Sequence, residues 1–253
     1  MKITFLGTGT SQGIPVISCS CEVCTSKNPK DNRLRVSVMI EEEGKNFVID
    51  SGPDFRQQML REKVKSLSAV VFTHEHKDHI AGLDDVRAFN YFSGNPIDVY
   101  GDERVHIALR REYHYAFSGV NYPGIPKLNV HLIDKNPFDV QGVKFIPIEV
   151  LHYQLPVLGF RVNDFTYITD ANYISDEELL KIKGTKVLVL NALRKEKHIS
   201  HFTLNEAIEL IEKLKPERAY LTHISHQLGL HDEVSKELPE NVYLAYDGLQ
   251  IEL

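Results

Sequence analysis

The chain has 253 residues, of which 42% are hydrophobic, and a formal net charge of −6 from 35 acidic and 29 basic residues. This composition supplies a sizeable core, and the length predicts one domain over residues 1–253. The basic surplus of a protein that wraps nucleic acid is missing. No apolar run has membrane-spanning length and no secretory leader is apparent, so we expect a cytoplasmic protein without nucleic-acid or membrane partners.

Alternating hydrophobic patterns and turn signals divide the chain into many short strands, with helical patterns between them. Strands are expected over residues 2–6, 36–40, 47–50, 69–72, 97–100, 130–133, 143–150, 160–162, 165–169, 187–190, 219–222 and 242–245. Helices are expected over residues 54–63, 79–92, 103–117, 175–183 and 204–215. Strand-rich halves with helices outside predict two sheets packed face to face under helical layers.

All three cysteines lie near the N-terminus, where Cys19, Cys21 and Cys24 have a C-x-C-x2-C spacing. Thiolates at this spacing surround one tetrahedral ion and leave its fourth corner for another ligand. An odd cysteine count in a chain expected in the cytoplasm argues against structural disulfides. A redox pair or buried small side chains are the alternatives, but the spacing favours a metal-binding loop at about residues 18–28.

The most informative segment is the H-x-H-x-D-H run at residues 74–79, directly after an apolar strand pattern. Its ligand-type residues are His74, His76, Asp78 and His79. Neutral imidazole nitrogens and a carboxylate are ligands for first-row divalent metals. The alternative is a solvated polar turn that merely contains histidines, and the density of ligand-type residues favours a metal site.

Three further ligand-type residues, His152, Asp170 and His223, each follow a predicted strand. Because strand ends are the usual location of sites in sheet enzymes, this repeated placement predicts that they join the 74–79 segment. Asp50 also follows a strand pattern. We expect it to orient a ligand histidine through the second ring nitrogen, with an ordinary strand-end turn as the alternative.

A third local signal is the H-I-S-H-F-T segment that contains His198 and His201. Thr203 is predicted to cap the following helix, because Glu206 lies three residues later as in a capping box. The two histidines therefore lie at a junction between a loop and a helix. A histidine there is either a surface residue or a side chain of the active site.

The segment 113–124 combines four aromatic rings with a connection rich in glycine and proline. Aromatic side chains at helical spacing are more often part of a core. If the segment instead overhung the metals, its rings would stack on a sugar or base and set specificity. The sequence leaves both alternatives open.

Taken together, these motifs resemble the metallo-β-lactamase superfamily. The resemblance rests on F-L-G-T-G-T-S at residues 5–11, D-S-G at 50–52, the 74–79 run, and then His152, Asp170 and His223 in order. It implies an α+β fold that forms a four-layer αββα sandwich, with Asp170 bridging two metals. The first metal would be bound by His74, His76 and His152, and the second by Asp78, His79 and His223.

Within the superfamily, the chain resembles the phosphoribosyl cyclic phosphate phosphodiesterases of carbon–phosphorus bond metabolism. Their Cys-rich loop binds a structural zinc completed by a histidine three places after the last catalytic histidine, and here His226 holds that position. His231 is a second candidate for the fourth ligand. The resemblance also implies that His201, rather than His198, contacts the scissile phosphate and assists the leaving oxygen.

The expected reaction is hydrolysis of a small, cyclic phosphodiester by a hydroxide held between two divalent ions. Manganese or zinc suits the mixed imidazole and carboxylate ligands of the pair, and zinc suits the thiolates. Asp78 would be both a ligand and a proton acceptor, and His201 would protonate the leaving alkoxide. The sequence leaves a homodimer open.

Other functions are weighed against this one. A transfer-RNA 3′-end endonuclease would share the ligands but needs a protruding arm rich in Gly, Pro and Lys, and none stands out at residues 160–193. A thioester or lactone hydrolase stays open, and a non-catalytic metal-binding module is disfavoured by the full ligand set. The similar redox enzymes carry a carboxylate two residues after the first histidine, where this chain has His76, so an oxygen-reducing di-iron site is disfavoured.

Overall fold

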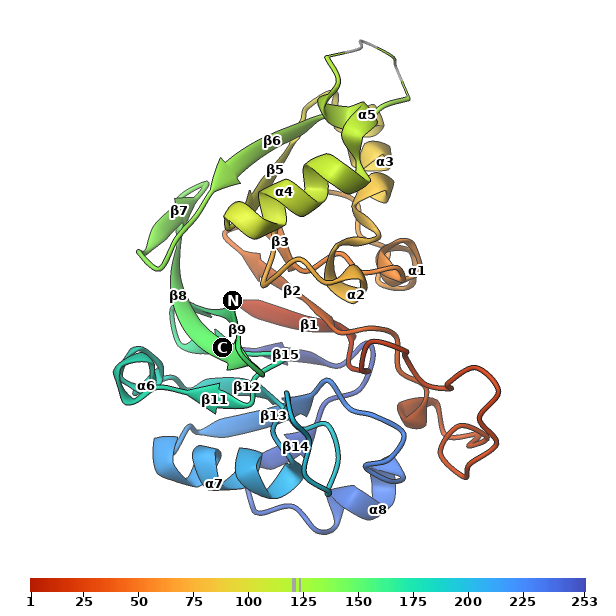
Figure 1. The fold of residues 1–253 in the computed structure, drawn as a ribbon, viewed down its shortest axis with the longest axis vertical. Coiled ribbons are helices and arrows are strands. Elements are labelled where there is room, and N and C mark those ends of the chain that lie inside the picture. Colours follow the sequence, from red (N-terminus) through yellow and green to blue (C-terminus); the bar gives the residue numbers. More distant parts are fainter. Residues whose placement is uncertain (120–121, 123) are drawn as a thin grey trace.

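The structure is a computed structural model that describes residues 1–119, 122 and 124–253 of the chain. Two β-sheets lie face to face, and helices cover their outer faces (Figure 1). The first half of the chain forms most of one sheet with its helices, and the second half forms the other. The last strand returns to the first sheet and pairs with the first strand, so the two termini lie side by side.

The first sheet has seven strands, in the order β15 (Gln250–Glu252), β1 (Lys2–Gly7), β2 (Ser37–Glu42), β3 (Lys45–Ile49), β4 (Ala69–Val71), β5 (Ile97–Gly101) and β6 (Leu128–Leu132). The second has eight, in the order β11 (Tyr173–Ile174), β8 (Val143–His152), β9 (Leu155–Val162), β10 (Phe165–Tyr167), β12 (Val187–Asn191), β13 (Arg218–Thr222) and β14 (Val242–Leu244), while β7 (Phe138–Val140) pairs with β8. In each sheet a run of neighbouring strands is parallel, so their carboxyl ends meet at one edge.

The helices are α1 (Phe55–Arg61), α2 (Lys77–Ile80), α3 (Arg87–Ser93), α4 (Glu103–Glu112), α5 (His114–Phe117), α6 (Asp176–Ile182), α7 (Leu204–Leu214) and α8 (His231–Ser235). Two 3₁₀ turns span Pro29–Asp31 and Leu83–Val86. No helix in the described part of the chain is long and apolar enough to cross a membrane.

Three hydrophobic clusters fill the spaces between the layers. The cluster between the sheets includes Phe5 and Phe47 from the first sheet and Phe160 and Tyr167 from the second. One outer cluster joins the first sheet to α1, α3 and α4, and the other joins the second sheet to α6, α7 and α8. The predicted αββα sandwich is therefore confirmed, since each sheet buries one face against the other sheet and one against helices.

Every predicted strand has a counterpart in the structure. The prediction missed the short strands β7, β11 and β15, and it missed α8. These strands have only two or three residues each, and, unlike the equally short β4 and β10, they are not part of a longer apolar run. The predicted N-cap of α7 is confirmed, because Thr203 and Glu206 form both hydrogen bonds of a capping box.

The single helix predicted over residues 79–92 is wrong, because the segment is divided into the end of α2, a 3₁₀ turn and α3. The interruption lies at Gly82, whose N–H donates to the Ser51 carbonyl at 2.8 Å. A Cβ added to Gly82 would lie 2.0 Å from the Gly52 carbonyl oxygen. Only glycine fits this close approach of two backbones. The close approach interrupts the helix at this residue.

The helix predicted over residues 103–117 is likewise interrupted, because α4 ends at Glu112 and Tyr113 leaves the helical conformation before α5. The Tyr113 hydroxyl donates to the Ile80 carbonyl at 2.7 Å, which ties this turn to α2. In a continuous helix, the Tyr113 side chain would point in another direction and its hydroxyl would not meet the Ile80 carbonyl.

Most of the aromatic segment at residues 113–124 belongs to the core. Tyr113, Tyr115 and Phe117 pack against the outer cluster of the first sheet, whereas Tyr122 is 66% exposed. The core alternative therefore holds for three of the four rings. Residues 120, 121 and 123 of this segment lie outside the described residues.

Candidate metal centre and active site

The structure gathers the predicted ligands from both sheets at the edge where their strands end. His74 follows β4, and α2 then presents Asp78 and His79. From the second sheet, His152 ends β8, Asp170 follows β10 and His223 follows β13. The crossing of two sheets thus places residues that are distant in the sequence around one point.

Three residues of this region adopt left-handed backbone conformations, with φ of 64° at Asp50, 56° at Asp170 and 54° at His223. Such values are uncommon for residues other than glycine and cost about 1–3 kcal/mol each. Each of the three residues follows a strand, and the side chains of Asp170 and His223 join the donor groups. Non-glycine residues in this conformation often lie at functional sites.

The first group of donor atoms belongs to His74, His76 and His152, which lie within 4.8 Å of one another. The His74 Nε2 and His76 Nδ1 atoms are 2.9 Å apart. His152 donates a hydrogen bond from Nδ1 to the Ser200 carbonyl at 3.0 Å. Its other ring nitrogen, Nε2, is therefore free to bind a metal. The structure thus brings together the three residues predicted to bind the first metal.

The second group contains Asp78, Asp170 and His223, again within 4.8 Å of one another. His79 joins them, because its Nε2 lies 3.2 Å from Asp78 Oδ2 and 3.4 Å from Asp170 Oδ2. All four side chains predicted around the second metal therefore lie in contact distance.

Asp170 is the centre of the whole arrangement. Its carboxylate oxygens lie 2.9 Å from His223 Nδ1, 3.6 Å from His201 Nε2 and 3.8 Å from His74 Nε2. Burial alone would raise the pKa of Asp170, but the imidazoles of His223 and His79 hold it well below the usual range. An ionised, buried carboxylate that reaches both groups has the position of a bridging ligand.

Asp50 lies behind His79, with its Oδ2 2.7 Å from His79 Nδ1. It also accepts hydrogen bonds from the Thr73 N–H at 2.9 Å and the Thr73 hydroxyl at 2.8 Å. Burial raises the pKa of Asp50, while these donors oppose the rise. A carboxylate that holds one ring nitrogen directs the other towards the site, as in metal-bound histidines generally.

Two observations test whether divalent metals fit these residues. Among the described residues, His79 Nε2 and His201 Nε2 are buried nitrogens without a hydrogen-bond partner, and such atoms are costly unless a ligand satisfies them. Ligand atoms at about 2.1 Å from one ion lie about 3.0–3.4 Å apart. The spacings of His79 Nε2 from the Asp78 and Asp170 carboxylates lie within that range, so metals fit.

His201 lies beside the donor groups, 8% exposed, with its ring stacked on His223 at 4.8 Å. Because the Ser200 N–H donates to His198 Nδ1, that nitrogen carries no proton, and His201 Nδ1 donates to it at 3.2 Å. Burial lowers the pKa of His201 to about 4. His201 therefore faces Asp170 with Nε2, whereas His198 supports it from behind.

The predicted thiolate cluster is also assembled. The Sγ atoms of Cys19, Cys21 and Cys24 lie 3.4, 3.3 and 3.6 Å from His226 Nδ1. In a zinc tetrahedron with bonds of about 2.3 Å to sulfur and about 2.1 Å to nitrogen, this separation is about 3.6 Å. The four side chains therefore fit a zinc ion.

The thiols of Cys21 and Cys24 differ in their acidity. The Cys24 N–H, together with His226, lowers the pKa of Cys21 to about 6, whereas burial raises the pKa of Cys24 to about 11. Zinc would displace the proton from Cys24, since thiolates are its ligands.

His231, the competing fourth ligand, lies elsewhere. It is 5% exposed, its Nδ1 lies 3.1 Å from Arg33 Nη2, and its backbone N–H donates to Asp31 at 2.7 Å. The geometry thus favours His226 for the thiolate cluster and gives His231 a role in anchoring the N-terminal loop.

Two residues that support the site were missed. Thr73 contacts Asp50 and lies 3.0 Å from His74 Nδ1, and Ser200 holds His152 through its carbonyl. Both adjoin predicted site residues in the sequence, but threonine and serine at strand ends and in loops are too common to be informative.

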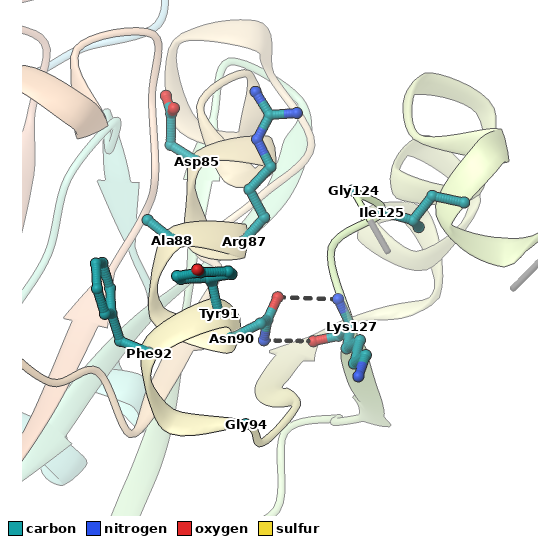
Figure 2. A pocket seen from close by; sticks show the side chains of 10 residues that line it. All are labelled: Asp85, Arg87, Ala88, Asn90, Tyr91, Phe92, Gly94, Gly124, Ile125 and Lys127. Atoms are coloured by element: carbon teal, nitrogen blue, oxygen red, sulfur yellow. Dashed lines mark hydrogen bonds between the residues drawn. The ribbon is translucent and has the colours of Figure 1, made fainter. Parts of the chain in front are cut away.

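A separate pocket of about 550 Å³ lies between α3 and the segment that leads into β6 (Figure 2). Tyr91 and Phe92 line it, and Asn90 closes one wall by accepting from the Lys127 N–H and donating to its carbonyl. None of the described residues that line this pocket is a predicted ligand. The metal centre is therefore a different region of the molecule.

The model of the family described as Beta-lactamase superfamily domain matches residues 45–224. An octanoyltransferase of Porphyromonas gingivalis is 38% identical over 253 residues, which are 99% of this chain and 51% of that protein. A ribonuclease Z of Methanosarcina acetivorans is 31% identical over 167 residues, which are 63% of this chain and 47% of that protein. The chain thus spans about half the length of these curated relatives.

Two solved structures are similar over the whole chain. A diphosphatase from the PhnP family has a TM-score of 0.93 and 39% sequence identity, with coverage of 100% of this chain and 97% of that one. The short form of human tRNase Z has a TM-score of 0.74 at 20% identity, covers 100% and 99% of the two chains, and supports the fold alone. The chain therefore belongs to the metal-dependent hydrolases of the metallo-β-lactamase superfamily, within the PhnP family.

Proposed function

We propose that the chain hydrolyses a small, cyclic phosphodiester at a centre of two divalent metals. The observation that carries this proposal is the position of Asp170, whose carboxylate lies within 4 Å of ring nitrogens from both donor groups and from His201. A bridging carboxylate with a histidine beside it suits displacement at phosphorus, where negative charge develops on several oxygens.

In this proposal one metal is held by His74, His76 and His152, the other by Asp78, His79 and His223, and Asp170 joins both. Manganese or zinc suits these ligands, and zinc suits the thiolate cluster. Two such ions would supply Lewis acidity that activates water and neutralises charge on the phosphoryl oxygens.

Asp78 and His201 have the proton-transfer roles. The pKa of Asp78 is lowered, because His79 outweighs the effect of burial, so Asp78 is an ionised acceptor for a proton of the attacking water. His201 directs Nε2 into the site. The negative charge of a bound phosphodiester would raise its pKa from about 4, so that the imidazolium donates a proton to the leaving oxygen.

A diphosphate ester is a second candidate substrate. The PhnP-family structure that is 39% identical to this chain is named a diphosphatase. Its reaction would also break a bond between phosphorus and oxygen, so the same ligands serve both. A diphosphate leaving group needs a proton less than an alkoxide does, so His201 should matter less for this substrate.

The names of two other relatives suggest different activities. Residues 160–193 form the end of β9, then β10, β11, α6 and β12 with short connections, which leaves no protruding arm of the kind expected for a transfer-RNA endonuclease. The chain matches only 51% of the octanoyltransferase, so acyl transfer can reside in the other half of that protein. We therefore propose neither activity for this chain.

Parallel assays test the proposal. The substrates are a ribose cyclic phosphate, bis(p-nitrophenyl) phosphate, a nucleoside diphosphate ester, a structured transfer-RNA precursor and a thioester. We expect turnover of the cyclic phosphate above all others, and elemental analysis should find two catalytic metals and one zinc per chain. Preference for the diphosphate ester would favour the second candidate, and turnover of only the thioester would contradict both.

A further inference from the structure

One guanidinium group holds the first part of the loop that carries His198 and His201. Arg194 donates from Nε to the Glu196 carbonyl at 3.2 Å and from Nη2 to the Lys197 carbonyl at 3.0 Å. Its Nη1 donates to Gln227 Oε1 at 2.8 Å. One side chain thus joins the loop to a segment 33 residues later in the sequence.

That later segment belongs to the thiolate cluster. Gln227 directly follows His226, whose Nδ1 faces the three cysteine sulfurs. The Gln227 N–H donates to the Ser225 hydroxyl at 3.0 Å, and the Ser225 N–H donates to the Leu193 carbonyl at 3.0 Å. The turn that holds Gln227 is therefore fixed at both ends, by the thiolate cluster and by the residue before Arg194.

The ends of the loop are anchored by the backbone, but its middle is not. The Leu193 N–H donates to the Phe202 carbonyl at 3.0 Å, and the Leu204 N–H donates to the Arg194 carbonyl at 2.9 Å. Between these anchors Lys195, Glu196 and Lys197 are exposed, and the carbonyls of the last two are held by Arg194. The guanidinium therefore sets the path by which the chain reaches His198, and the Ser200 carbonyl, which accepts from His152 Nδ1 at 3.0 Å, holds the next turn before His201.

We propose that Arg194 is a positioning residue that transmits the geometry of the thiolate cluster, through Gln227, to His201. The inference rests on the proposed role of His201 as the group that assists the leaving oxygen. It gives the thiolate cluster a function beyond holding the N-terminal loop. A shift of about 1 Å in a reacting group can lower turnover by roughly 10^2-fold, so small movements of this loop matter.

The three hydrogen bonds require the planar fork of arginine. A lysine at this position keeps the positive charge but cannot direct donors to three separate oxygens. Arg194→Lys therefore separates the geometry of the clamp from the effect of its positive charge. On the other side, Gln227→Glu keeps an acceptor for the guanidinium, whereas Gln227→Ala removes it.

The experiment measures kcat and KM of metal-loaded variants on an alkyl phosphodiester and on a p-nitrophenyl phosphodiester. We expect Arg194→Ala and Arg194→Lys to lower kcat on the alkyl substrate by about 10-fold or more, with KM near wild type and a much smaller loss on the nitrophenyl substrate. Gln227→Ala should show the same pattern more weakly, and Gln227→Glu should restore turnover. Lys195→Ala is the matched control, because Lys195 pairs with Glu237 alone at the surface and should leave both rates unchanged.

A double-mutant cycle with His201→Ala decides the route of the effect. If Arg194 acts through His201, adding Arg194→Ala to His201→Ala should cause no further loss. Multiplicative losses, or a raised KM with equal losses on both substrates, would show that Arg194 contacts the substrate instead and would overturn the inference. If His201→Ala alone does not distinguish the two leaving groups, the proposed function of His201 fails first, and the inference fails with it.

Metal content and melting temperature complete the experiment. All variants should keep three metals per chain, because neither Arg194 nor Gln227 is a donor in either cluster. A variant that has lost the thiolate zinc acts through that metal, and its loss of turnover would then contradict the proposed clamp. If Arg194→Ala does not fold, the Gln227 pair gives the same test without altering the loop.

Discussion

The two candidate metal clusters differ in how the chain builds them. The thiolate cluster takes three of its four side chains from six consecutive residues and is partly exposed throughout. The cluster around Asp170 collects side chains from both sheets, and His74, His79, Asp170 and His223 are all at most 2% exposed. A local sequence motif therefore defines the first cluster almost completely, whereas the second exists only once the two sheets pack together.

The difference also separates stability from chemistry. Burial of imidazoles and carboxylates costs folding free energy, and these groups serve to bind metal and substrate. The thiolate cluster instead closes a loop on the body of the protein, so its metal should act mainly on the folded state. Loss of the cluster around Asp170 should remove activity, and loss of the thiolate cluster should lower stability.

The largest expected effect is that of Asp170→Ala. Removal of residues that only orient a metal ligand costs about 10–100-fold, so removal of a carboxylate shared by both donor groups should lower turnover by roughly 10^3-fold or more. Elemental analysis should find fewer than two catalytic metals, with the thiolate zinc retained. Asp164→Asn, at an exposed carboxylate paired with Lys186, is the control and should be fully active. An Asp170→Ala variant with both metals and normal turnover would contradict the bridging role.

His201→Ala comes next. It should reduce turnover of an alkyl phosphodiester by roughly 10^2–10^4-fold, the usual contribution of a general acid, and leave metal content unchanged. A p-nitrophenolate leaving group needs no proton, so that substrate should lose less. Equal losses on both would mean that His201 only positions the phosphate, and no loss on either would return attention to His198.

Cys21→Ser tests the other side of the comparison. One zinc should be lost and the melting temperature should fall, since a loss of about 2 kcal/mol corresponds to roughly 4–8 °C at this chain length. The catalytic metals should stay. Ser20→Ala, at the exposed neighbour, is the control for the loop itself. A variant that keeps all its zinc and its melting temperature would disprove the thiolate site.

The smallest expected effect is at the N-terminus of α7. Thr203→Ala removes the capping box and should destabilise the protein by about 1 kcal/mol, measured by urea unfolding. Thr203→Ser keeps the hydroxyl and should be close to wild type. Because His201 lies two residues before the cap, a large loss of turnover in Thr203→Ala without a loss of metal would show that the helix end also positions His201.

The side chains of both candidate clusters could be predicted from the sequence because ligand chemistry depends on residue type. Histidine, aspartate and cysteine at strand ends and close spacings are rarely accidental, and the structure brings all of the predicted donors together. The choice between His226 and His231 could not be made in this way. It depends on whether His231 faces the sulfurs or Arg33, which only the packing of the N-terminal loop decides.

The supporting contacts were also beyond reach of the sequence. The interruption at Gly82 follows from the approach of a backbone 30 residues earlier, and the clamp at Arg194 depends on a glutamine 33 residues later. The left-handed conformations of Asp50, Asp170 and His223 could not be predicted from the sequence, because aspartate and histidine adopt them more often than most residue types but still only in a minority of cases. Such features arise from tertiary structure and not from local preference.

The arrangement of donors along the chain has a mechanical consequence. In the cluster around Asp170, the side chains of residues 74–79 come from the first half of the chain. All the others come from the second half, beyond β7. Bound metals would therefore link the two sheets and would not belong to either sheet alone. A chain cut in the connection between β6 and β7 would give two pieces, neither of which holds a complete ligand set, so the metals themselves become part of what keeps the sandwich closed.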